Sequence, residues 1–319
     1  MRIDPAGGSA VSIGVDIGGT KCLGVVVRDD RVVAEYRVAT PHDGAGLVTA
    51  VAEVVDRLAG DAPEAPVGVG APGLVDDAGS LRFAPNLPGV TELALGSLLK
   101  ERLGRSAVVV DNDATCACWA ETRLGAARGR SHVLMATIGT GIGGGLVAGG
   151  ELQRGRHGFA GEIGHMVVDP GGPRCPCGQS GCWERFASGS GLGWIAREAA
   201  IAGVAQRVVE LAGGDPEAVR GEHVTVAAAQ GDPEARAVMA RFAWWLALGL
   251  ANLANAFDPE LIVLGGGMIE AGSVLLDPAR EAFARLLEGA AHRPLVPIVA
   301  AELGERAGAV GAALRARRE

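Results

Sequence analysis

Hydrophobic residues alternate along the chain between two patterns, one typical of strands and one typical of helices. Apolar, β-branched runs predict strands over Val11–Asp16, Lys21–Val27, Arg31–Val38, Val67–Gly70, Ala107–Asp111 and 261–267. Apolar residues at helical spacing predict helices over 47–58, 92–103, 112–124, 236–257, 275–287 and 307–317. Because strands and helices take turns along the chain, the fold class is predicted to be α/β.

The middle of the chain repeats the pattern of its beginning. At an offset of 121 residues, Ile138 falls on Ile17, the run SIGVD falls on VLMAT and the turn GGT falls on GTG. Two copies of one hairpin predict two related domains that face each other across a cleft. The alternative is a chance similarity between two glycine-rich hairpins.

Composition places the chain among globular proteins. It has 319 residues, of which 48% are hydrophobic and 21% charged, which suffices for two domains. A net charge of -8 argues against nucleic acid or an anionic membrane as the main partner. The first residues lack the apolar core of a signal peptide, and the run Phe242–Ala251 is half of the roughly 20 residues that span a bilayer. We therefore expect a cytoplasmic, reducing location.

Two glycine turns, DIGGTK at 16–21 and GTGIGGG at 139–145, each lie between two apolar strands. Glycine lets backbone N–H groups close on phosphate oxygens. A strand rather than a helix follows each turn, which excludes a Rossmann loop, and the order Thr-Lys excludes a Walker A loop. The alternative is that tight hairpins need glycine for the turn alone. The candidate nucleotide-binding residues are Asp16, Gly18, Gly19, Thr20, Lys21, Gly139, Thr140 and Gly141, with Gly265 and Gly266 for the nucleoside.

The stretch DNDA at 111–114 lies where a predicted strand ends and a helix begins. An N-cap with favourable helix-dipole contacts is one interpretation. Beside phosphate loops, however, the carboxylate of Asp113 can accept the proton of an attacking hydroxyl, as aspartate does in phosphoryl transfer. Asn112, and Asn86 in the turn NLPG, are candidates to orient the same acceptor.

The stretch RCPCGQSGCWE at 174–184 holds three of the six cysteines. In a reducing compartment such a cluster more often binds metal than forms a disulfide. A closed tetrahedral site needs four ligands, so a fourth must lie elsewhere. His165 and His157 are the rival candidates for that position.

The motifs DIGGTK, APG at 71–73, DNDA, GTGIGGG, GEIGH at 161–165 and CPCGxxGCWE occur in an order that resembles the ROK family, within the actin-like, hexokinase-like (ribonuclease H-like) ATPases. The resemblance runs from about residue 12 onward, and is greatest to the bacterial ATP-dependent glucokinases. One departure is TCAC at 115–118, where relatives carry Asn-Ala-Ala-like residues. We expect Thr115 to alter packing without moving Asp113, and Cys22, Cys116 and Cys118 to be core thiols.

The resemblance implies a fold, a set of roles and a set of ligands. It implies a smaller N-terminal domain over 1–115, completed by the C-terminal helix at 303–319, and a larger domain over 116–302 that carries a zinc loop, with the active site in the cleft. It implies structural zinc bound by His165, Cys175, Cys177 and Cys182, and sugar hydroxyls bound by Glu162, His165 and Glu184. It further implies MgATP as donor, Asp113 as base, and a homo-oligomer, dimer or tetramer.

The implied activity is phosphorylation of the 6-hydroxyl of glucose. A kinase for N-acetylglucosamine, N-acetylmannosamine, mannose or fructose has the same motifs, and polyphosphate remains an alternative donor. A sugar-responsive regulator is the rival from another class. Regulators of this family carry a winged-helix segment before the DIGGT strand, which here begins by residue 12. We therefore expect an enzyme.

Overall fold

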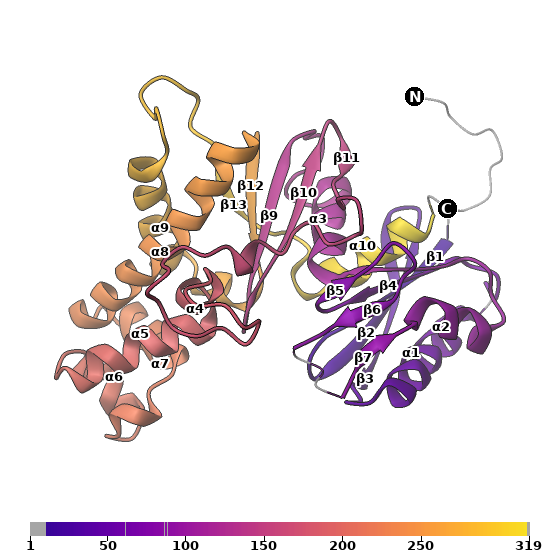
Figure 1. Cartoon of the computed structure of the whole chain (residues 1–319), viewed down its shortest axis with the longest axis horizontal. Coiled ribbons are helices and arrows are strands. Elements are labelled where there is room, and N and C mark those ends of the chain that lie inside the picture. Colours follow the sequence, from indigo (N-terminus) through magenta and orange to yellow (C-terminus); the bar gives the residue numbers. More distant parts are fainter. Residues whose placement is uncertain (1–10, 61, 86, 88, 318–319) are drawn as a thin grey trace. The chain divides into compact units, whose positions relative to one another are not determined.

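The computed structural model describes residues 11–60, 62–85, 87 and 89–317, which form two compact units (Figure 1). Unit 1 consists of the segments Met1–Ser131, Gly145–Gly161 and Glu302–Glu319. Unit 2 consists of His132–Gly144 and Glu162–Ala301. Both are α/β, as the alternating pattern predicts.

The main sheet of unit 1 has the order β3-β2-β1-β4-β8. Its first three strands form an antiparallel meander, and β4 and β8 run parallel to β1. The five strands are β1 (Val11–Ile17), β2 (Lys21–Arg28), β3 (Arg31–Ala39), β4 (Val67–Ala71) and β8 (Val108–Asn112). The strands predicted from apolar runs are confirmed, with ends within about two residues.

Helices α1 (Gly44–Ala59) and α10 (Ala307–Ala316) cover opposite faces of this sheet. Gly24 on β2 faces Val54 of α1 and pairs with Val15 on β1, so both lie on the α1 face. The preceding residue on β1, Gly14, points the other way and faces the backbone of α10. This follows because successive residues of a strand alternate between faces.

Glycines bring α10 into direct contact with its neighbours. A Cβ atom at Gly14 or at its cross-strand partner Gly68 would lie 1.9 or 1.8 Å from a carbonyl oxygen of α10. On the helix itself, a Cβ atom at Gly311 would lie 1.7 Å from the carbonyl oxygen of Cys116 in α3 (Asp113–Leu124). The three missing side chains thus allow the helix to pack backbone to backbone against β1, β4 and α3.

A small antiparallel sheet in unit 1 is absent from the sequence prediction. It consists of β5 (Leu74–Val75), β6 (Leu81–Phe83) and β7 (Thr91–Leu93), and is followed by α2 (Leu95–Leu103). The helix predicted from residue 92 therefore begins three residues late. Glu92 has φ of 51°, a left-handed conformation that cannot start an α-helix.

The second sheet has the order β11-β10-β9-β12-β13, which matches the first sheet strand for strand. As β4 does with β1, β12 pairs in parallel with β9. The internal repeat read from the sequence is therefore confirmed. The strands are β9 (Val133–Ile138), β10 (Ile142–Ala148), β11 (Glu151–Leu152), β12 (Leu261–Gly265) and β13 (Ile298–Ala300).

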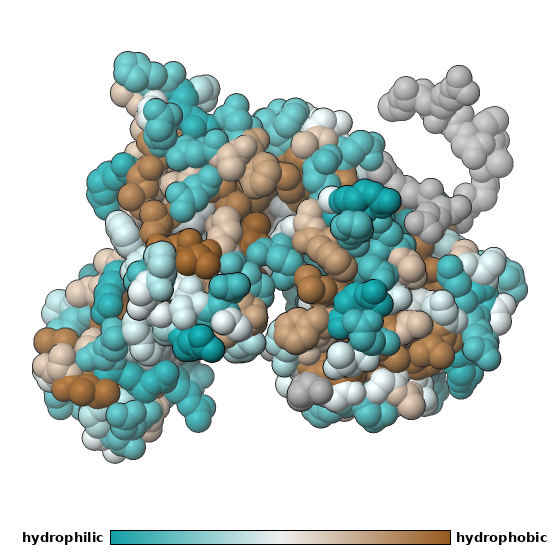
Figure 2. All heavy atoms as spheres, in the orientation of Figure 1, coloured by the Kyte–Doolittle hydropathy of each residue, from teal (hydrophilic) through white to brown (hydrophobic). Residues whose placement is uncertain are grey.

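Unit 2 carries most of the helices. They are α4 (Glu184–Ala187), α5 (Gly189–Ile201), α6 (Gln206–Leu211), α7 (Gly221–Ala229), α8 (Pro233–Phe257) and α9 (Ser273–Leu286). Among the described helices, α8 alone is long and apolar enough to cross a membrane. Its most apolar window is 61% buried, which is typical of a core helix. On the face in Figure 2, hydrophilic and hydrophobic residues of the described chain are interspersed.

Substitution of Gly68 by alanine tests the close packing of α10. The new methyl group would meet the backbone of Ala312, which cannot move aside as a flexible side chain would. We expect Gly68→Ala to lower the free energy of unfolding by about 1–3 kcal/mol, the usual cost of overpacking. Gly267→Ala is the control, because nothing lies within 4 Å of its Cβ position. Equal stability of the two variants in urea unfolding would contradict the packing argument.

Candidate active site and metal centre

The first glycine turn joins β1 to β2. The N–H of Gly18 donates to the carbonyl oxygen of Lys21 at 2.9 Å and closes the turn. Gly19 and Thr20 are exposed, and no described group accepts a hydrogen bond from the backbone N–H of either. The turn therefore presents two unused donors, which is what an anion-binding loop requires.

Lys21, predicted to donate to phosphate, lies in a charged network. Its Nζ atom is 2.5 Å from Oε2 of Glu305, whose Oε1 lies 2.6 Å from Nη2 of Arg37. The Lys21 and Glu305 side chains are about half exposed, so the pair contributes little to stability. Glu305 was not anticipated from the sequence, because 284 residues separate it from Lys21.

Asp16 and Asp113 lie on either side of Gly70. Asp16 is near the end of β1, and Asp113 is the first residue of α3. A Cβ atom at Gly70 would lie 3.3 Å from Oδ1 of Asp16 and 3.4 Å from Cα of Asp113. Glycine at this point of β4 therefore lets two carboxylates approach each other.

The carboxyl group of Asp16 is held in an unusual environment. Its Oδ1 atom is buried and receives no hydrogen bond from any described residue. Burial, together with the negative charge of Asp113, raises the pKa of Asp16 to about 8, against the opposing effect of Lys21. A buried carboxylate oxygen without a donor is a suitable ligand for a hard cation, which would restore the charged form.

Asp113 lies in the opposite kind of environment. Asn112 is the N-cap of α3, because its side chain accepts from the N–H of Thr115 at 2.9 Å and donates to the carbonyl of Gly73 at 3.1 Å. Oδ1 of Asp113 accepts from the N–H of Ala114 at 2.8 Å. The N-terminal end of a helix favours the ionised form of a carboxylate. The N-cap of this helix is therefore Asn112 and not Asp113. The side chain of Asp113 is partly exposed.

A buried ion cluster fixes the strand end that precedes Asp113. Asp111 is 1% exposed and accepts from Nε of Arg154 at 3.1 Å and from Nε of Arg315 at 3.2 Å. Two guanidinium groups compensate the cost of burying this charge. Sequence reasoning missed both arginines, since neither lies in a motif.

The second glycine turn joins β9 to β10 and lies beside the turn at 265–267. Gly139 donates to the carbonyl oxygen of Gly141 at 3.0 Å, and no described group accepts from the N–H of Thr140 or Gly141. A Cβ atom at Gly266 would lie 2.4 Å from the carbonyl oxygen of Ile138. The structure therefore brings the predicted nucleoside turn next to the second phosphate turn.

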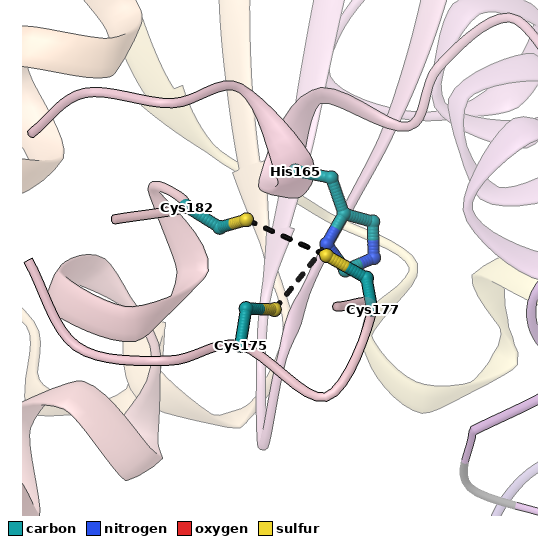
Figure 3. A group of neighbouring side chains, drawn as sticks. All are labelled: His165, Cys175, Cys177 and Cys182. Carbon is teal, nitrogen blue, oxygen red and sulfur yellow. Dashed lines mark hydrogen bonds between the residues drawn. The ribbon is translucent and has the colours of Figure 1, made fainter. Parts of the chain in front are cut away.

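Four side chains in unit 2 form a candidate metal centre (Figure 3). The ligand atoms of His165, Cys175, Cys177 and Cys182 all lie within 4.8 Å of one another. Sγ of Cys177 is 3.6 Å from Sγ of Cys182, and Sγ of Cys175 is 3.7 Å from Nδ1 of His165. A disulfide needs about 2.05 Å between sulfurs. A tetrahedral zinc site with Zn–S bonds of about 2.3 Å places its ligand atoms about 3.8 Å apart, so the geometry fits zinc.

His165, rather than His157, completes this group. The ring of His157 lies beside Phe159, with centroids 6.4 Å apart. The three cysteines are free thiols, and burial together with hydrogen bonds between Cys182 and the thiols of Cys177 and Cys175 raises the pKa of Cys182 to about 12. A bound dication would stabilise the thiolates that such burial disfavours.

The other ring nitrogen of His165 faces a carboxylate. Nε2 lies 3.9 Å from Oε2 of Glu162, while Nδ1 faces the thiols. Burial and the charge of Glu184 raise the pKa of Glu162, and His165 opposes this. Glu184 contacts both the candidate metal centre and the start of β10. Its Oε1 is 3.7 Å from Sγ of Cys175, and its Oε2 accepts from the N–H of Ile142 at 3.1 Å. The three predicted sugar-binding residues of unit 2 therefore lie around the metal centre.

Trp183 anchors this loop in the core of unit 2. The side chain is fully buried, and its Nε1 donates to the carbonyl of Trp245 in α8 at 2.8 Å. Gly249 makes room for the indole, because a Cβ atom there would lie 2.0 Å from the ring. The neighbours Cys182 and Glu184 are thereby fixed. Asn86 lies outside the described residues, and Cys22, Cys116 and Cys118 are buried thiols as predicted.

The chain is similar to known proteins over almost its whole length. Residues 12–319 match the ROK family. The chain is similar to the glucokinase of Streptomyces coelicolor, at 41% identity over 96% of this chain and 98% of that one, and to the glucokinase of Thermotoga maritima, at 37% identity over 94% and 95%. Its fold is similar to the crystal structure of a ROK family glucokinase from Streptomyces griseus in complex with glucose and AMPPNP, with a TM-score of 0.85 and 42% identity over 97% and 100% of the two chains.

Asp16 should make the stability of the chelator-treated protein depend on pH. Its folded pKa of about 8 exceeds the unfolded value of 3.8, so the folded state binds a proton that the unfolded state lacks. The contribution of Asp16 to stability therefore falls as pH rises from about 4 to about 8. We compare the free energy of unfolding of Asp16→Asn with that of the wild type at two pH values. We expect the difference, variant minus wild type, to be about 1–3 kcal/mol larger at pH 8 than at pH 5. Urea unfolding at both pH values would measure this, and a pH-independent difference would refute it.

Proposed function

The chain belongs to the ROK family, and on this basis we propose that it is a glucokinase, which transfers the γ-phosphoryl group of ATP to the 6-hydroxyl of glucose. The similarity to glucokinases over almost the whole chain supports this function. The observation that carries it in this chain is the placement of Asp113. A carboxyl group at the start of α3, close to Asp16 across Gly70, suits proton abstraction during phosphoryl transfer.

In the proposed reaction the O6 hydroxyl of the sugar donates its proton to the carboxylate of Asp113. The oxygen forms a bond to the γ-phosphorus as the bond to the β–γ bridging oxygen breaks, and ADP leaves with that electron pair. Asp113 suits this role because it lies at the N-terminus of a helix, where a negative charge is stabilised, whereas burial and the charge of Asp113 raise the pKa of the neighbouring Asp16 to about 8. The two carboxyl groups thus lie in different environments, which suit Asp113 as the base and Asp16 as a cation ligand.

We assign sugar binding to Glu162, His165 and Glu184 of unit 2, and to Asn112 and Asn86 with Asp113. Carboxylates and an imidazole at mutual distances of a few ångströms suit neighbouring hydroxyls of one hexose. The amide of Asn112 is already hydrogen-bonded to the backbone of Thr115 and Gly73, which fixes the direction of the neighbouring Asp113. One N–H of the amide remains for the sugar. The proposed substrate is glucose; the other hexoses named above share this hydroxyl chemistry.

We assign the phosphates of ATP to the two glycine turns and the nucleoside to Gly265 and Gly266. Unused N–H donors in both turns support this assignment. The donor-free oxygen of Asp16 fits Mg²⁺, which when bound would neutralise charge on the phosphates. Lys21 would exchange Glu305 for a phosphate oxygen.

We propose that the four-residue centre binds structural zinc. Three thiols and one imidazole are a typical closed set for zinc, which leaves no coordination position open for a substrate. Zinc would hold the loop at 175–182, and through it Glu184 and His165, in the orientation that binds sugar. We also expect the protein to be cytoplasmic. We further expect a homo-oligomer, either a dimer or a tetramer, and light scattering would measure its mass.

Asp113→Asn tests the proposed base. The amide cannot accept the proton, so we expect kcat to fall by about 10²- to 10⁴-fold with little change in glucose affinity. A coupled assay with glucose and five other hexoses, each with ATP or polyphosphate, measures activity and identifies both substrates. Asp232→Asn is the matched control, because Asp232 is the N-cap of α8 and asparagine caps helices equally well. A variant that keeps a tenth of the wild-type rate would remove Asp113 from this role.

Loss of the metal centre should weaken sugar binding more than ATP binding. We expect about one zinc per wild-type chain, and loss of it in Cys177→Ala and His165→Gln. Disorder of Glu184 should then raise the KM for glucose about tenfold, which corresponds to about 1.4 kcal/mol. Metal analysis and titrations with glucose and ATP measure these effects, and Cys118→Ala, a buried thiol outside the centre, is the control. A metal-free wild type with full glucose affinity would exclude both the zinc and the coupling.

A further inference from the structure

The carbonyl groups of both glycine turns are held by residues outside the turns. In the first turn, Oγ1 of Thr40 donates to the carbonyl oxygen of Gly18 at 2.7 Å, and the backbone N–H of Thr40 donates to that of Thr20 at 3.1 Å. Thr40 is buried and lies directly after β3, the third strand of the meander. One residue therefore takes up two carbonyl groups of the predicted phosphate loop.

The second turn has the same arrangement, built from different elements. The N–H of Gly189 donates to the carbonyl oxygen of Gly139 at 2.8 Å, and Oγ of Ser190 donates to that of Thr140 at 2.9 Å. Both donors belong to the first turn of α5, whose N-cap is Ser188. Each turn thus has one side-chain hydroxyl and one backbone N–H that bind its carbonyl oxygens.

Holding a carbonyl group also fixes the direction of the next N–H group. The peptide unit is planar and trans, so its C=O and N–H bonds point in opposite directions. The carbonyl of Gly18 shares a peptide with the N–H of Gly19, and the carbonyls of Gly139 and Thr140 share peptides with the N–H groups of Thr140 and Gly141. These three N–H groups are among those that donate to no described acceptor. They therefore point away from Thr40, Gly189 and Ser190.

Glycine makes such a restraint necessary. Peptides that flank glycine rotate at little steric cost, because glycine adopts positive and negative φ about equally well. A rotated peptide would present a carbonyl oxygen, with its partial negative charge, where an N–H group should meet a phosphate. A hydroxyl bonded to the carbonyl opposes this rotation before any ligand binds, which is preorganisation.

We propose that Thr40 and Ser190 are positioning residues for the nucleotide, whose hydroxyls keep the carbonyl groups of the two glycine turns turned away from the phosphate chain. This inference rests on the proposed function, since it assigns how the same two turns recognise phosphate. In this role each hydroxyl acts through the carbonyl group that it binds and not by contact with the ligand. The thiol of Cys22, whose Sγ lies 3.6 Å from Oγ1 of Thr40, is a weak partner and does not replace the hydroxyl.

The test compares Thr40→Val and Ser190→Ala with the wild type. Each variant removes one hydroxyl and keeps the backbone N–H groups. We expect the dissociation constant for AMPPNP and the KM for ATP to rise about fivefold in each, which corresponds to about 1 kcal/mol, with a smaller change in kcat. The dissociation constant for glucose should not change. Thr40→Ser keeps a hydroxyl at the same position and should restore ATP affinity.

Thr49→Val is the matched control, because Oγ1 of Thr49 donates to the carbonyl of Ala45 within α1, away from either turn. Unchanged affinity for AMPPNP in folded Thr40→Val and Ser190→Ala would overturn the inference. So would an equal loss of glucose and AMPPNP affinity, which a general structural role produces. If Thr40→Val does not fold, the exposed Ser190→Ala decides. A wild type that neither binds AMPPNP nor phosphorylates glucose would overturn the proposed function and this inference together, whereas an active wild type with unaffected variants overturns this inference alone.

Discussion

Direct contact between the backbone of α10 and its neighbours is the constraint on which the candidate active site depends. Glycines at 14, 68 and 311 remove the side chains that would separate this helix from β1, β4 and α3. The first turn of the helix consequently reaches Asp16, where a Cβ atom at Gly308 would lie 2.6 Å from the carboxyl carbon. Its last turn carries Arg315 to the buried Asp111. One helix therefore determines the environment of two of the three acidic residues around the site.

Those three carboxyl groups show how one chemical group takes different roles through its surroundings. Asp111 is buried between two guanidinium groups and serves as a structural ion. Asp16 has a buried oxygen that receives no hydrogen bond from the described residues, and its pKa is raised. Asp113 lies at the start of a helix, where the ionised form is favoured. Burial, paired charge and the helix dipole thus give three neighbouring carboxyl groups different environments, which suit a structural anion, the proposed cation ligand and the proposed base.

The parts of the structure that the sequence predicts are those with a local signal. In the β1–β2 and β9–β10 hairpins, a glycine turn joins two apolar strands. In the cysteine loop, proline and glycine residues lie between the three cysteines. The parts it does not predict depend on pairs far apart in the chain. Arg154 and Arg315 lie 43 and 204 residues from Asp111, and Ser190 lies 50 residues from Thr140. The small sheet was missed because its strands have only two or three residues, too few to show a period of two.

The segmented composition of unit 1 has a consequence for how the protein is made. Glu121 is fully buried and accepts hydrogen bonds from the N–H groups of Ala126, Glu302 and Leu303, so the end of α3 binds the chain where it re-enters unit 1. A nascent chain synthesised as far as residue 131 contains β1 and β4, with Gly14 and Gly68. It does not yet contain α10, the helix that covers these two strands. Translation must therefore deliver all of unit 2 before unit 1 can close its core, and until then the apolar face that awaits α10 is open to chaperones and proteases.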